Sequence, residues 1–171
     1  AVQGDFRNML DALAVHFADN DFLLGERPCL ADFALAGASK AHFICDPEPK
    51  SWLGEHSDML HEYTGRFFSD WQGELAPWSA NDRVPDSLQI VLDYLQGSYY
   101  QSAPANIAAG LAGEKYYEFN FGFGNTRART QKRLNLARLH VQDELQRLGA
   151  GDNADVRDLF GSRRILEHYL A

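Results

Sequence analysis

Apolar residues recur every three or four positions along most of this chain, which is the spacing of one face of an α-helix. The pattern predicts five helices, over residues 5–18, 30–44, 57–70, 88–99 and 126–148. An alanine-rich helix is also expected over 105–112, and one or two closing helices over 153–170. Pro104 should interrupt the helical pattern, because proline lacks the backbone N–H that a helix interior requires.

The period changes near residues 116–123, where Tyr117, Phe119, Phe121 and Phe123 alternate with polar residues and glycine. A two-residue repeat predicts a strand or the arm of an extended hairpin. Loops or turns are expected around Pro47 and Pro49 and over 71–85, where the helical spacing fails. The chain is therefore predicted to be all-α: a helical bundle in a single domain, 1–171, with one short extended segment near 116–123.

The net charge of −8 makes nucleic acid an unfavourable general partner, so none is expected. Five basic residues nevertheless fall on the helix predicted over 126–148: Arg127, Arg129, Lys132, Arg133 and Arg138. They form either an ordinary solvated face or a phosphate-binding face.

The apolar stretches are much shorter than the roughly 20 residues that a membrane span needs, and no secretory signal pattern opens the sequence. We therefore expect a cytoplasmic protein without membrane contact. Its two cysteines, Cys29 and Cys45, are expected to be free thiols. Cys45 could be reactive, but the carboxylate of Asp46 beside it would raise a thiol pKa, so we expect a buried, inert cysteine there. No histidine or cysteine cluster has metal-ligand spacing, so no metal is expected.

The segment Phe22–Leu35 carries the most specific motif, F-L-L-G-E-R-P-C-L-A-D-F-A-L. Its second half predicts a capping box, with Cys29 as N-cap and Asp32 reaching back to the N-cap backbone. A thiol is a weak acceptor, so the cap should be weaker by about 0.5–1 kcal/mol than one made by serine or threonine. The small residues that follow in 30–44 suggest a helix packed closely on its neighbours.

This segment resembles the one that leads into the central helix of the all-α C-terminal domain of glutathione transferases. Looser resemblances follow in Tyr63-Thr-Gly-Arg66 and in Arg83-Val-Pro-Asp-Ser-Leu88, which is similar to a V-P-E-T-L segment of bacterial transferase-like proteins. The resemblance is strong over 22–35 and looser to about 148, so that 5–148 would form the transferase-like core.

The resemblance implies a helical domain that supplies an apolar substrate wall and part of a homodimer interface. It implies glutathione as co-substrate, a small apolar electrophile as second substrate, and an N-terminal thioredoxin-like domain as partner. That domain is absent from these residues, and in the family it carries the group that activates the glutathione sulfur. No catalytic residue is therefore assigned here, and the chain alone is expected to be inactive.

Four residues are candidates for substrate binding. The resemblance places His42, Phe43 and Asp46 near the cleft between the two domains, with Phe43 against the electrophile and His42 on its polar atoms. The interpretation that we favour needs no ligand: a core aromatic beside a partly exposed histidine. Tyr100 falls off the apolar stripe of its helix, which suggests a pocket or an interface. The alternative function is a non-catalytic module for binding a protein or a ligand.

Overall fold

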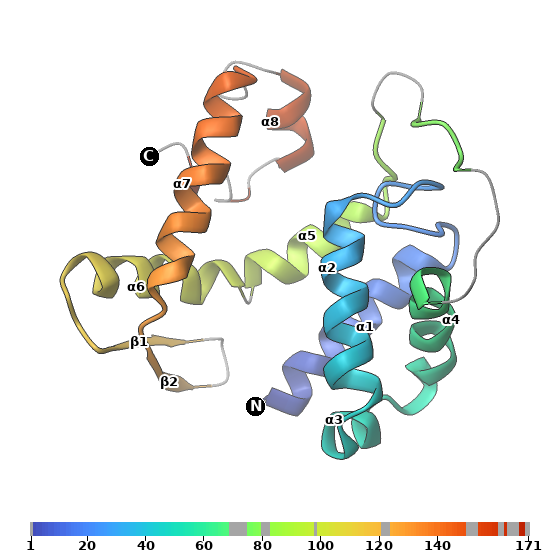
Figure 1. Cartoon of the computed structure of the whole chain (residues 1–171), viewed down its shortest axis with the longest axis horizontal. Helices are drawn as coiled ribbons and strands as arrows, with labels where there is room; N and C mark the ends of the chain where they lie inside the picture. The colour runs from blue at the N-terminus through green and yellow to red at the C-terminus, as the bar shows by residue number, and fades with distance from the viewer. Residues whose placement is uncertain are drawn as a thin grey trace. The chain divides into compact units, whose positions relative to one another are not determined.

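The computed structural model describes residues 2–68, 75–79, 83–97, 99–120, 124–149, 154–160, 163 and 168–169 (Figure 1). The described residues are mostly helical, with one two-stranded antiparallel sheet, which agrees with the predicted helical class. The chain divides into two compact units, Ala1–Val91 and Leu92–Ala171, and each is described by itself. The prediction of one domain over 1–171 stays a prediction.

The N-terminal unit begins with α1 (Val2–Phe17) and α2 (Leu30–Ala38) and continues through the π-helical turn η1 (Ser39–Ile44). It then contains α3 (Pro47–Trp52), the 3-10 turn η2 (Gly54–His56), α4 (Ser57–Phe68) and the start of α5 (Leu88–Gly97). The loop expected around Pro47 and Pro49 is wrong. Pro47 is the first residue of α3, where its missing N–H has no helical partner to lose.

The core of this unit joins α1 to residues from three later elements. Phe6, Leu10, Ile44, Leu53 and Leu60 are buried together. The spacing over 5–18 thus predicted the correct face of α1. The Phe43 ring also meets the Phe6 ring edge-on, at 4.8 Å between centroids, which extends this core toward the end of η1.

Helix α2 is less enclosed than its small residues suggested. Asp32, Ala36 and Ser39 are buried on one side. On the other side Leu30 is 85% exposed and Phe33 57% exposed, and the alanines at 31, 34 and 38 are exposed as well, as is Ala41 in η1. An apolar face of this helix is therefore open among the described residues.

The C-terminal unit contains α6 (Tyr99–Leu111), the hairpin of β1 (Tyr116–Asn120) and β2 (Asn125–Arg129), α7 (Lys132–Arg147) and α8 (Ala154–Phe160). The strand predicted near 116–123 is confirmed over 116–120, and residues 121–123 lie outside the described part. The helix predicted from 126 is wrong at its start, because 126–129 form β2 and the helix begins at Lys132. Pro104 does not interrupt a helix, since α6 runs through it.

Two other predicted regions are described in part. Residues 75–79 and 83–85 are irregular, as expected for the predicted loop, and the rest of that loop lies outside the described residues. Of the closing helices over 153–170, α8 and a helical pair at 168–169 are described. None of the described helices has the length and apolar character needed to cross a membrane.

Candidate ligand pocket in the N-terminal unit

The buried carboxylate of Asp32 fixes the start of α2 and the loop that precedes it. The Cys29 N–H donates to Oδ2 at 2.8 Å, and the Leu23 N–H donates to Oδ1 at 2.8 Å. The Tyr63 hydroxyl, from α4, donates to the same Oδ1 at 3.1 Å. One carboxylate thus ties together the N-cap, the loop and a neighbouring helix, in a position that the dipole of α2 favours for negative charge.

The capping box predicted for Cys29 and Asp32 is present, but its two arms are unequal. The Asp32 side chain makes the strong arm. The Asp32 N–H faces the Cys29 sulfur yet also donates to the Cys29 carbonyl oxygen at 3.0 Å, which leaves the sulfur as a secondary acceptor. Burial, followed by the nearby Asp32 carboxylate, raises the pKa of the Cys29 thiol. Cys29 is therefore a structural thiol rather than a nucleophile.

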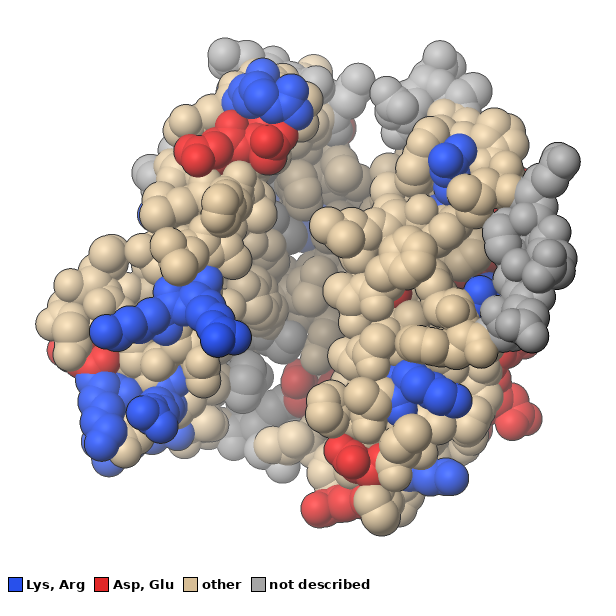
Figure 2. All heavy atoms as spheres, in the orientation of Figure 1, with Lys and Arg blue, Asp and Glu red and all other residues tan. Residues whose placement is uncertain are grey.

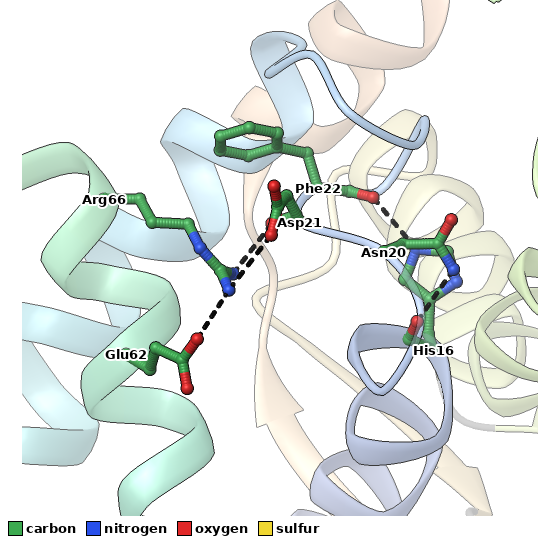
Figure 3. A network of polar contacts seen from close by, with 6 residues as sticks. All are labelled: His16, Asn20, Asp21, Phe22, Glu62 and Arg66. Atoms are coloured by element: carbon green, nitrogen blue, oxygen red, sulfur yellow. Dashed lines mark hydrogen bonds and ion pairs between the residues drawn. The ribbon is translucent and has the colours of Figure 1, made fainter. Parts of the chain in front are cut away.

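A second network holds the loop between α1 and α2 from its other end (Figure 3). His16 is fully buried, with Nε2 at 3.2 Å from the Phe22 carbonyl oxygen and Nδ1 at 2.9 Å from the Ser87 hydroxyl. A carbonyl oxygen only accepts, so Nε2 carries the proton, and in the neutral ring Nδ1 accepts from Ser87. Asn20 donates to the same hydroxyl at 3.1 Å. The imidazole thus has a structural role here.

Arg66 joins α4 to the same loop, as Figure 3 shows. Its guanidinium donates to the Asp21 carbonyl oxygen at 2.9 Å and lies 3.3 Å from the Asp21 carboxylate and 3.0 Å from Glu62. Sharing one guanidinium between two carboxylates and a carbonyl restricts where the loop can lie. The loop between α1 and α2 is consequently fixed from the sides of α1, α2 and α4.

These fixed segments enclose a hollow of about 760 Å³. Its apolar wall is mainly aromatic and its rim is charged; the lining residues are Asp21, Phe22, Glu26, Arg27, Pro28, Phe33, Arg66, Phe67, Leu75, Ala76 and Trp78. The Phe67 ring meets the rings of Phe22 and Phe33 edge-on, at 5.6 and 5.2 Å between centroids. The hollow is large enough for a small organic molecule.

Arg27 is the second arginine that lines the hollow. Its guanidinium lies over the Trp78 ring, 4.8 Å from the centroid, and donates to the Ala76 carbonyl oxygen at 3.4 Å. The stacked guanidinium keeps donors free for an anionic group, whereas Arg66 is already shared among acceptors. The site therefore suits an apolar, planar ligand with an anionic or polar end near Arg27.

The described lining of the hollow offers few groups that could take part in a reaction. Among the described residues that line it there is no serine, cysteine or histidine, and so no candidate nucleophile or general base beyond the carboxylates of Asp21 and Glu26. No set of three or more His, Cys, Asp or Glu side chains in the described part of the chain could hold a metal ion.

The residues predicted to bind substrate lie elsewhere. His42 and Asp46 do come together, with Nδ1 3.2 Å from a carboxylate oxygen, but both are largely exposed, at 68% and 55%. Phe43 packs on Phe6 in the core. Tyr100 belongs to the C-terminal unit, where its hydroxyl lies 3.5 Å from that of Tyr169. None of the four lines the hollow, and their role in binding stays a prediction.

Sequence reasoning missed the residues that form the hollow. Phe33 and Arg27 belong to the quoted motif, yet their spacing carries no sign of a shared cavity. Phe67 and Trp78 are more than 30 residues further along the chain than Phe33. Exposed aromatic residues in a predicted loop, such as Trp78, were the one available signal.

Comparison with family models gives one match: the glutathione S-transferase C-terminal domain, over residues 1–38. These 38 of 171 residues comprise α1, the capped loop and α2, and support similarity to that family for this segment. Comparisons with curated proteins and with solved structures find no match.

Proposed function

We propose that this chain is the helical domain of a glutathione transferase-like protein, and that its aromatic hollow is the wall against which a small apolar electrophile binds. The observation that carries the proposal is the hollow itself. Six of its eleven lining residues lie within the segment that matches the family, and the capped α2 holds them in place. The helices would then form the bundle expected of such a domain.

In this reaction the thiolate of glutathione attacks an electrophilic carbon, a sulfur–carbon bond forms, and the leaving group departs with its bonding electrons. A thioredoxin-like partner domain would bind glutathione and stabilise the thiolate. The present chain would orient the electrophile on Phe33, Phe67 and Trp78 and exclude water from its apolar side. His42, Phe43, Asp46 and Tyr100 remain candidates for contacts beyond this wall.

The open face of α2 supports a partner domain. Leu30 and Phe33 place apolar side chains in solvent, and the exposed alanines on this side would let another element approach closely. We assign this face to the thioredoxin-like domain, and we expect the assembled protein to be a homodimer.

Binding of anilinonaphthalene sulfonate, an apolar anion whose fluorescence rises in apolar surroundings, tests the hollow directly. We expect saturable binding that chlorodinitrobenzene displaces. Phe33→Ala should weaken binding about fivefold, if the ring covers roughly 40 Å² of probe at about 25 cal/mol per Å². Leu30→Ala is the matched control, because Leu30 is exposed on the same helix but does not line the hollow. Equal affinities for both variants would rule out this hollow as the binding wall.

A non-catalytic ligand-binding module is the second candidate, and the hollow with its aromatic wall and charged rim supports it, since such a site can hold a ligand without a partner domain. Both candidates predict that the chain alone does not conjugate glutathione to chlorodinitrobenzene. Turnover by the purified chain would contradict the assignment of sulfur activation to a partner domain. Joining the chain to a thioredoxin-like domain separates the candidates: turnover that falls with Phe33→Ala supports the transferase, whereas probe binding without turnover supports the module.

A further inference from the structure

Acidic and basic residues are distributed unevenly between the two parts of the chain. Residues 1–91 contain six Lys and Arg against fifteen Asp and Glu, a net charge of −9, whereas residues 92–171 contain ten against nine, a net charge of +1. Between positions 115 and 138 there are six basic residues and one acidic residue, Glu118. Figure 2 shows the Lys and Arg side chains gathered over the hairpin and the start of α7, at the lower left.

The basic side chains of the hairpin share one face. In the antiparallel register Tyr116 lies opposite Arg129, and Glu118 lies opposite Arg127, so these four side chains point to the same side. The Arg127 guanidinium lies over the Tyr116 ring, 4.4 Å from its centroid. This stacking holds the guanidinium flat without using its N–H donors.

Neither Arg127 nor Arg129 has an acidic partner among the described residues, in contrast to four other arginines. Arg66, Arg83, Arg147 and Arg163 each lie within 3.4 Å of a carboxylate oxygen. Among the described residues no ion pair involves Arg127 or Arg129, although Glu118 is directly across the hairpin from Arg127. Two exposed guanidinium groups on one strand are therefore available to an external anion.

The backbone groups of Arg127 and Arg129 lie at the outer edge of β2, the edge away from β1. The Thr130 N–H donates to the Lys115 carbonyl oxygen at 3.0 Å, which makes that pair a hydrogen-bonded one. Hydrogen-bonded and non-bonded pairs alternate along an antiparallel ladder, so the backbone groups of Arg127 and Arg129 face away from β1. Helix α6 packs along β1, whereas β1 is the only described element that packs extensively on β2.

We propose that the free edge of β2 binds an extended peptide in which acidic residues alternate with apolar residues, adding it to the hairpin as a third strand. The backbone groups of Arg127 and Arg129 pair with the peptide backbone. Their guanidinium groups bind carboxylates two residues apart, since alternate residues of a strand share a face. Lys132 and Arg133, at the start of α7, add positive charge near the end of the added strand.

The apolar residues of the proposed peptide would lie on the other face of the hairpin. Tyr117 and Phe119 stack there, with 5.3 Å between ring centroids, and Thr126 and Ala128 lie opposite them. Peptide side chains beside Thr126 and Ala128 would thus meet a half-apolar surface, where valine or threonine fits. Arginines on an edge strand also repel a second copy of the same strand, so they select an acidic partner.

A peptide accounts for these features better than a nucleic acid does. The phosphates of a nucleic acid could pair with the guanidinium groups. A phosphodiester backbone, however, cannot form the ladder of hydrogen bonds that outward N–H and C=O groups at every second residue offer to a peptide strand. A nucleic acid would also bring many charges close to a protein of net charge −8.

Fluorescence anisotropy with a labelled peptide of about seven alternating Glu and Val residues tests the proposal on the full chain. We expect saturable binding that weakens as salt rises from about 0.05 to 0.5 M. A peptide of the same composition with its glutamates gathered at one end should bind at least about fivefold more weakly. Equal binding of the two peptides, or tighter binding of an oligothymidylate of equal charge, would overturn strand addition.

Two substitutions at one position separate backbone pairing from charge. Arg127→Gln should weaken binding about two- to fivefold through the lost guanidinium. Arg127→Pro also removes the outward N–H, which a sheet edge tolerates, and should weaken binding a further roughly three- to tenfold. Arg147→Gln is the control, since Arg147 is an exposed arginine paired with Glu144 at the far end of α7. Equal losses in the Gln and Pro variants would leave only an electrostatic patch and refute the proposal.

Amide hydrogen exchange on the unaltered chain gives a readout that does not depend on how the proline variant folds. Peptide binding should slow exchange of the Arg127 and Arg129 amides, which face the free edge. The ladder amide of Ala128 should change much less. A peptide N-methylated on the residues that face β2 should not bind, and binding by that peptide would contradict the model.

Discussion

Replacing Asp32 by asparagine tests the central claim about the N-terminal unit, that one carboxylate fixes α2, the loop and α4. The amide retains one oxygen, which can keep the Leu23 N–H and Tyr63 O–H bonds as neutral ones. Its NH₂ group then faces the Cys29 N–H, and two donors oppose each other. The charged bond to Cys29 is lost, at about 1.5–3 kcal/mol, and the helix dipole term of about 0.3–1 kcal/mol disappears.

The smaller desolvation cost of a neutral side chain offsets part of this loss, and the two opposed donors at Cys29 add a similar cost. We therefore expect Asp32→Asn to lower the free energy of unfolding by about 2–4 kcal/mol. All three tryptophans, at positions 52, 71 and 78, belong to the N-terminal unit, so tryptophan fluorescence reports on its unfolding. With an m-value of about 2 kcal/mol/M in urea, the midpoint should fall by about 1–2 M.

Asp46→Asn is the matched control, because Asp46 is an exposed aspartate whose partner, His42, is exposed as well. Surface pairs contribute roughly 0–1 kcal/mol, so its midpoint should move by less than about 0.5 M. A midpoint for Asp32→Asn that coincides with this control would refute the reasoning that the buried carboxylate organises the loop.

Three further predictions concern single groups. Cys45 is exposed, so the expectation that it is buried and inert is wrong. Iodoacetamide should alkylate Cys45 faster than Cys29, whose pKa is raised by burial. Mass spectrometry of peptides at short times measures both, and faster reaction at Cys29 would contradict its structural role. Burial and the nearby carboxylate raise the pKa of Tyr63, so its stabilising contribution is complete below the unfolded pKa of about 10 and is lost as pH rises above it. The unfolding free energy of Tyr63→Phe should therefore fall less between about pH 9 and 11 than that of the unaltered chain. Asn106→Ala should cost about 2–3 kcal/mol in urea unfolding followed by circular dichroism, because it removes both bonds to the Gln131 backbone, and a loss below about 0.5 kcal/mol would show that water replaces them.

The parts of the fold that could be predicted are those governed by local spacing. The apolar stripe of α1 and the Asp32–Cys29 arm of the capping box both depend on residues within a few positions of one another. The other partners of Asp32 could not be predicted, since Tyr63 lies 31 residues away and donates only because α4 packs beside α2. The hollow could not be predicted for the same reason, because its aromatic side chains come from segments that are far apart in the sequence.

Strand β2 shows a different limit. Its sequence, Asn-Thr-Arg-Ala-Arg, contains only one apolar residue, Ala128, and no large one, so its alternation is too weak to indicate a strand by itself. It becomes a strand by pairing with β1, whose aromatic alternation was visible. The basic residues were in consequence placed on one helical face, whereas two of them lie on a sheet and three on α7.

The π-helical turn at Ser39–Ile44 affects how this segment can change in length. A π-helical turn is geometrically an α-helix with one extra residue, so deleting one residue there can restore regular α-helical winding without breaking the chain's path. Because the wide turn already absorbs that residue, the deletion would leave the residues after it in nearly the same orientation relative to α2. A variant lacking Lys40 should therefore keep both its helicity and Ile44 in the core, whereas deleting one residue within α2 would rotate the later side chains by about 100° and displace Ile44.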